Sequence, residues 1–225
     1  MLLLGIDTAT SAVTVAVHDG DGVLAECSTL DARRHGEYLA PGITQTLADA
    51  GRTVDEVTAV VVGTGPGPFT GLRIGLVTAR TFAFARGIPV FGVCSLDAMA
   101  HQAWLEDAAG LGQSLVVATD ARRKEVYWAR YDVCPAGALR RGEPMVAKAG
   151  AIADDVRGLP VAGRGAVLYA EWFGRRVGPL DVNAGALADL AARRLAAGEE
   201  LGAADPMYLR RPDAMPLALR KQVLP

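Results

Sequence analysis

The chain has 225 residues, of which 51% are hydrophobic, and a formal net charge of −2, so composition excludes a disordered chain. Arginine doublets are scattered along a nearly neutral chain, which argues against a dedicated nucleic-acid-binding domain. Three widely separated cysteines without a CxxC motif argue against a disulfide framework or a structural zinc. Neither a signal peptide nor a long apolar run is recognisable, so we expect a cytoplasmic protein without membrane partners.

Hydrophobic periodicity predicts a regular alternation of elements in the first half of the chain. Three strands are followed by a helix, a strand, a helix, a strand and a helix, over residues 2–7, 12–18, 23–30, 37–50, 57–62, 72–86, 88–93 and 95–104. We expect Thr70 to be the N-cap of the helix over 72–86 and Ser95 to cap the helix that follows it.

The second half of the chain is expected to repeat this order in a shorter form, after a linker over residues 106–113. The expected strands cover 115–119, 125–133, 144–147 and 160–163, and the expected helices cover 151–156, 167–173 and 184–197. The expected domains are therefore a first lobe over 1–105, a smaller second lobe over 106–205 and an extended tail over 206–225.

The element order βββαβαβα is that of a ribonuclease H-like sheet, the building block of the actin-like (ASKHA) ATPases. We therefore predict an α/β protein of two lobes, of which the second is reduced.

A glycine- and proline-rich loop over residues 63–75 joins a buried strand to a helix, which is where ligands and partners bind in open α/β sheets. It matches neither nucleotide fingerprint: Gly71 is followed by Leu72 instead of lysine, and the third glycine of G-x-G-x-x-G would fall on Pro68. Pro66 and Pro68 also remove two backbone donors. The loop is expected to be stiff, with a defined shape.

The loop and the first strand closely resemble the TsaB (YeaZ) family, whose members are partners of TsaD in the bacterial complex that makes threonylcarbamoyl-adenosine in tRNA. The matching segments are residues 5–10, 65–75, 120–127 and 208–210. One departure is Pro68, where the family usually has serine, so a hydroxyl at this position is not essential.

The resemblance implies a non-catalytic scaffold subunit that pairs with a TsaD-like catalytic partner. A TsaE-like ATPase would join the larger complex, and tRNA would be reached through it. Two rivals from other classes are a stand-alone ATPase or small-molecule kinase and a peptidase. Weakened phosphate motifs count against the first, and the absence of a nucleophile–base pair counts against the second.

The family comparison also bears on cofactors. TsaD-like proteins carry a histidine pair for a metal, whereas here His35 has no histidine four residues later, so no metal is predicted. Ala9 replaces the glycine of the first phosphate motif, and Asp7 either holds a metal-bound water or bonds its own hairpin. No intrinsic cofactor is expected, but ATP or ADP could bind at the partner junction, near Asp7, Thr10, Gly65, Gly67, Thr70, Gly71 and Arg73.

Small residues recur every four positions in the helix over 72–86, which favours close approach of another helix. The expected partner interface is Leu39, Ile43, Thr46, Arg73, Gly75, Val77, Ala79, Arg80 and Ala83, with Phe84 beside it. The alternative is packing against the protein's own second lobe. Without its partner the chain is expected to form a weak homodimer, which Ala79→Glu would disrupt.

Arg73 is expected in the first turn of this helix, where the macrodipole disfavours a cation by a few tenths of a kcal/mol. We therefore expect it to meet a partner carboxylate or a nucleotide phosphate.

Overall fold

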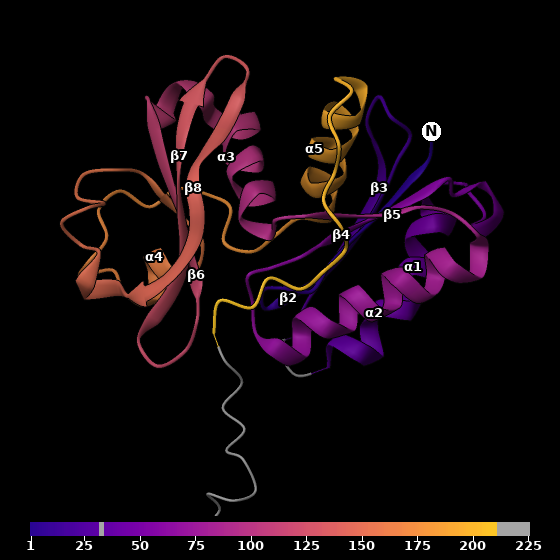
Figure 1. Cartoon of the computed structure of the whole chain (residues 1–225), viewed down its shortest axis with the longest axis horizontal. Coiled ribbons are helices and arrows are strands. Elements are labelled where there is room, and N and C mark those ends of the chain that lie inside the picture. The colour runs from indigo at the N-terminus through magenta and orange to yellow at the C-terminus, as the bar shows by residue number, and fades with distance from the viewer. Residues whose placement is uncertain (32–33, 211–225) are drawn as a thin grey trace, which may run out of the picture.

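The computed structural model describes residues 1–31 and 34–210, which form two β-sheets with helices between and around them (Figure 1). The first sheet has the strand order β3–β2–β1–β4–β5, with bounds β1 Leu3–Asp7, β2 Ala12–His18, β3 Val23–Leu30, β4 Ala59–Gly63 and β5 Val90–Val93. Strands β1, β2 and β3 pair antiparallel, whereas β4 and β5 run parallel to β1. This is the predicted ribonuclease H-like sheet.

The second sheet repeats part of this pattern. Its strand order is β8–β7–β6–β9, with bounds β6 Ser114–Asp120, β7 Glu125–Cys134, β8 Gly137–Lys148 and β9 Val161–Ala162. Strands β6, β7 and β8 pair antiparallel and β9 runs parallel to β6. Among the described residues no strand corresponds to β5, so the prediction of a reduced second lobe is confirmed.

Helices lie on both faces of the first sheet, which explains why β1, β2 and β4 are buried along their whole length. The helices are α1 His35–Asp49, α2 Phe69–Arg86, α3 Ser95–Leu111, α4 Gly165–Leu168 and α5 Ala184–Ala196, with 3-10 turns at Val54–Glu56 and Ala149–Ala151. Helices α1 and α2 cover the outer face of this sheet, and α3 and α5 lie between the two sheets (Figure 1). No described helix is both long enough and apolar enough to cross a bilayer.

A hydrophobic core shared by both sheets joins the two halves. It contains Leu3 and Val61 from the first sheet, Leu115 and Tyr131 from the second, and Leu187 from α5. A separate core lies between the first sheet and helices α1 and α2. The two halves are therefore held together by buried apolar area as well as by the covalent chain.

Several predicted elements differ from the structure. The expected linker over 106–113 is mostly the end of α3, which continues past Trp104 and is interrupted at Asp107 (φ −158°, ψ 63°). The helix expected over 151–156 is a series of turns after a 3-10 turn, and the one over 167–173 shortens to α4. Short alanine- and glycine-containing segments have weak periodicity, so packing decides their conformation.

The predicted division at residues 105 and 106 falls inside α3. Helix α5, which the sequence assigns to the second lobe, packs against β1 and β2 of the first sheet. Of the expected C-terminal tail, residues 206–210 are described: the Met207 amide donates to the Thr64 carbonyl at the end of β4 (2.8 Å), and Arg210 contacts the second half of the chain. Residues 211–225 lie outside the described residues.

Candidate functional site

The glycine loop packs directly against the end of β1. A Cβ atom added at Gly67 would lie 2.3 Å from the carbonyl oxygen of Ala9, and one at Gly71 would lie 2.8 Å from that of Thr8. At Gly75 the added atom would lie 2.4 Å from Thr8 Oγ1. These distances are too short for any side chain, so the glycines serve close packing within the chain.

Hydrogen bonds fix the same contact. Thr8 Oγ1 donates to the Gly71 carbonyl (2.7 Å) and accepts from the Gly75 amide (3.0 Å). The Gly65 amide donates to the Ser95 hydroxyl (3.1 Å). The amides of Gly65 and Gly75, which a phosphate loop could direct at its ligand, donate here to side chains within the protein.

Asp7 is completely buried beneath the loop. Its Oδ1 accepts from the Ala9 amide (2.7 Å) and its Oδ2 accepts from the Ser95 hydroxyl (2.5 Å). Burial raises the pKa of Asp7 to about 6, although both hydrogen bonds lower it. Of the two alternatives for Asp7, the hydrogen bond within its own turn is present.

A cleft of about 210 Å³ opens between the two halves, next to the loop. Arg164 makes hydrogen bonds of 2.8 and 2.6 Å to Asp181, and Arg122 lies 3.4 Å from Asp120, so each guanidinium is paired with a carboxylate. The cleft contains three of the residues predicted to lie near a nucleotide, Thr10, Thr70 and Gly71.

The other predicted nucleotide-proximal residues lie elsewhere. Asp7, Gly65 and Gly67 are buried and do not line the cleft, and Arg73 is exposed on α2. Thr70 is not the N-cap of α2: that position belongs to Pro68 and Thr70 lies within the first turn. The helix begins at Phe69, earlier than predicted, so Arg73 lies beyond its first turn.

Ser95 is likewise not a cap. Helix α3 has Cys94 at its N-cap position, and the Ser95 hydroxyl is used by Asp7 and Gly65 instead. Burial raises the pKa of the Cys94 thiol to about 12, so it is not an activated nucleophile.

The small-residue stripe of α2 faces its own sheet. Gly75, Ala79 and Ala83 are buried, as are three residues of α1, namely Leu39, Ile43 and Thr46. Six of the nine predicted interface residues are therefore largely buried against the chain itself, although Ile43 lines a shallow hollow at the surface. The reason is geometric, because a helix covering a sheet approaches most closely on the side where its residues are smallest. Ala79→Glu would place a charge in this core and is not a test of self-association.

The opposite side of α2 is exposed and partly apolar. We define the outer α2 stripe as Phe69, Arg73, Val77, Arg80 and Phe84, spaced as one helical face. Val77 is 60% exposed and Phe84 is 90% exposed. Shallow hollows flank Val77, one towards Phe69 and one towards α1.

The two arginines of this stripe differ. Arg80 pairs with Asp205, whereas Arg73 has no ion pair with any residue of the ranges 1–31 and 34–210. The Arg73 Cζ atom lies 4.8 Å from the centre of the Phe69 ring, and that ring stacks on Tyr208 (5.1 Å between centroids). Sequence reasoning missed the role of Phe69 and Tyr208, although both lie in segments that resemble the family.

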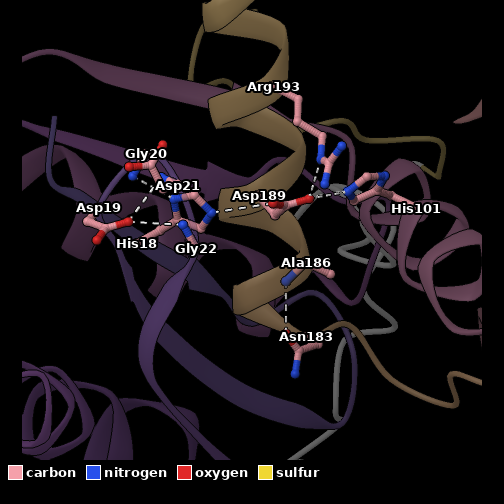
Figure 2. A network of polar contacts seen from close by, with 10 residues as sticks. All are labelled: His18, Asp19, Gly20, Asp21, Gly22, His101, Asn183, Ala186, Asp189 and Arg193. Carbon is pink, nitrogen blue, oxygen red and sulfur yellow. Dashed lines mark hydrogen bonds and ion pairs between the residues drawn. The ribbon is translucent and has the colours of Figure 1, made fainter. Parts of the chain in front are cut away.

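Histidines are used structurally, and His35 is buried with Nε2 3.2 Å from the Thr10 carbonyl oxygen. Figure 2 shows His18 of β2 and His101 of α3 on either side of Asp189 of α5, at 3.4 and 2.7 Å. Burial lowers the pKa of His101 although Asp189 raises it. The described residues contain no group of three or more His, Cys, Asp or Glu side chains that could hold a metal ion.

Comparisons with known proteins agree on one family. A family model described as tRNA N6-adenosine threonylcarbamoyltransferase, TsaD, matches residues 11–156. An uncharacterized protein of Mycobacterium tuberculosis strain H37Rv is 46% identical over 221 residues, covering 96% of this chain and 95% of that protein.

Two further relatives carry the family's names. The tRNA threonylcarbamoyladenosine biosynthesis protein TsaB of Escherichia coli is 38% identical over 131 residues, 58% of this chain and 55% of that protein. The solved structure of YeaZ from Pseudomonas aeruginosa has a TM-score of 0.79 and 30% identity, covering 92% of this chain and 99% of that one.

Proposed function

The chain belongs to the TsaB (YeaZ) family, and on this premise we propose that it is an accessory subunit in the formation of threonylcarbamoyl-adenosine in tRNA. Its task is to bind a TsaD-like catalytic partner, and it performs no chemistry of its own. A TsaE-like ATPase and the tRNA join through that assembly, in the cytoplasm.

The observation that carries this proposal is the outer α2 stripe. Val77 and Phe84 expose large apolar side chains on the outer surface of α2, which would favour burial against another protein. Arg73 lies among them without an ion-pair partner in the described chain. A partner surface of apolar residues with one carboxylate, or with a nucleotide phosphate held at the junction, would satisfy both features.

The internal use of the glycine loop supports a non-catalytic role. The Gly65 and Gly75 amides and the Asp7 carboxyl are hydrogen-bonded to neighbours, and the arginines of the cleft are paired with carboxylates. ATP or ADP, if it takes part, would therefore bind at the partner junction beside Arg73 and not in this cleft.

The test is binding of a TsaD-like protein from the same organism, measured by calorimetry. We expect Val77→Glu to weaken binding at least tenfold, because it places a charge in an apolar contact. Leu139→Glu is the matched control: Leu139 is 58% exposed, compared with 60% for Val77, and it lies on β8, far from α2 in the fold. Equal loss in both variants, or none in Val77→Glu, would contradict the proposed interface.

The same variant tests self-association. An exposed apolar face without its partner tends to bind a second copy weakly. Light scattering should show a weak dimer for the wild-type chain and for Leu139→Glu, and a monomer for Val77→Glu.

A further inference from the structure

The C-terminal segment over residues 202–210 runs from the region of α5 back across the first sheet (Figure 1). The Gly92 amide donates to the Gly202 carbonyl (2.8 Å), and Ala204 is buried in the core beneath α2. Asp205 pairs with Arg80, and the Met207 amide donates to the Thr64 carbonyl. We refer to residues 202–210 as the strap.

The strap reaches the outer α2 stripe through Tyr208. The Tyr208 ring stacks on Phe69 with an interplanar angle of 29°, and Phe69 in turn lies under the Arg73 guanidinium. Both rings are about 40% exposed, so they lie at the surface and not in the core. An aromatic pair restricts the position of Phe69, and a cation held over its ring samples fewer rotamers.

The far end of the strap is fixed to the second half of the chain. Arg210 donates to the Ala121 carbonyl (2.9 Å) and pairs with Glu125 (3.0 Å). These two residues flank Arg122, Arg123 and Lys124, whose φ values of 63°, 52° and 62° are unusual for residues with side chains. Arg210 therefore ties the end of the strap to a hairpin in which three consecutive residues are left-handed.

We propose that Tyr208 is a positioning residue: it holds Phe69 and thereby the Arg73 guanidinium in the place where the partner meets it. Arg210 anchors the end of the strap, so that the Tyr208 ring stays stacked on Phe69. An arginine already restricted before contact loses less conformational entropy on binding, so the strap raises affinity without touching the partner. This inference rests on the proposed function, because it concerns how the same interface is prepared.

A double-mutant cycle tests the coupling between Tyr208 and Arg73. We expect Arg73→Ala to weaken binding to the TsaD-like partner about tenfold and Tyr208→Ala about fivefold. The double variant should be no weaker than Arg73→Ala alone, since Tyr208 acts only through Arg73. Tyr208→Phe should restore wild-type affinity because it keeps the stacked ring.

The matched control is Trp172→Ala. Trp172 is 48% exposed, compared with 42% for Tyr208, and it lies in the second half of the chain, where it should not affect binding. Melting temperatures of all variants show whether folding is preserved. Additive losses in the double variant, or an unchanged affinity in a folded Tyr208→Ala, would overturn the inference.

A second measurement needs no partner. In the free chain, the Arg73 Nε–Hε group should show a higher heteronuclear NOE than it does in Tyr208→Ala, and Tyr208→Phe should match the wild type. Equal order in all three would also overturn the inference. If the wild-type chain bound no TsaD-like protein, the proposed function would fail, and this measurement would then decide whether Tyr208 positions Arg73.

Discussion

At the residue scale, Asp7 shows how a residue of a phosphate motif can become structural. Its carboxyl group has no exposed surface and is hydrogen-bonded by Ala9 and Ser95. Because burial penalises the ionised form, the folded protein holds a proton on Asp7 up to about pH 6, whereas the unfolded chain releases it near 3.8. The charge of Asp7 therefore opposes folding at neutral pH.

We expect Asp7→Asn to stabilise the protein more at pH 7.5 than at pH 4.5. The folded pKa of Asp7 is raised, so its protonated form favours folding at low pH and this contribution is lost as the pH rises through about 6. The gain from Asn should be about 2 kcal/mol larger at pH 7.5. Urea unfolding at both pH values measures it. A difference between variant and wild type that does not depend on pH would show that Asp7 does not titrate in this range.

At the scale of elements, α2 has one buried side and one exposed side. One side contacts the first sheet with small and large apolar residues alike, among them Leu72, Leu76 and Gly75, whose amide donates to Thr8. The other side carries the outer α2 stripe. The inner side is therefore buried against the sheet, whereas the outer side exposes large apolar side chains.

We expect Gly75→Ala to destabilise the protein by about 1–3 kcal/mol, because the added methyl group would overlap Thr8 Oγ1. Glycine to alanine inside a helix otherwise stabilises by up to about 1 kcal/mol. Gly36→Ala in α1, with no atom within 4 Å of the added group, is the matched control and should be neutral or stabilising. Thermal or urea unfolding of both variants gives the comparison, and the same sign in both would contradict the packing role of Gly75.

At the scale of the whole molecule, contacts that cross between the two halves are extensive. The shared core, the pair of histidines around Asp189 and the strap all connect them. Helix α5 contributes Leu187 to the shared core and Asp189 to the histidine pair. It packs on the first sheet although it follows the second sheet in the sequence. This arrangement suits the proposed role of a subunit that presents a fixed surface to a partner.

We expect the isolated chain to hydrolyse no ATP above the rate of a protein-free control. The Gly65 and Gly75 amides donate within the protein, and Arg164 is already bonded to Asp181 in the cleft. Steady-state turnover by the purified chain measures this. Turnover that disappears in Asp7→Asn would show that Asp7 takes part in catalysis and would contradict the proposed accessory role.

The sequence pattern of apolar residues, glycines and prolines predicted much of the fold by itself. Strands β2 and β3 have the predicted bounds, because alternating and β-branched residues between clear turn signals leave few other conformations. The glycine loop was located because a buried strand, glycines, prolines and a helix follow one another in sequence. Its resemblance to a known family also came from contiguous residues.

Only the tertiary structure decided which side of α2 is free. A stripe of glycine and alanine is equally compatible with a partner helix and with the protein's own sheet. The contact of Gly75 with Thr8, 67 residues away, shows that the stripe faces the sheet. The stack of Tyr208 on Phe69 joins residues even further apart in sequence. Periodicity reports which residues share a face, whereas long-range packing decides what that face meets, and the energy of that packing is absent from any local window of the chain.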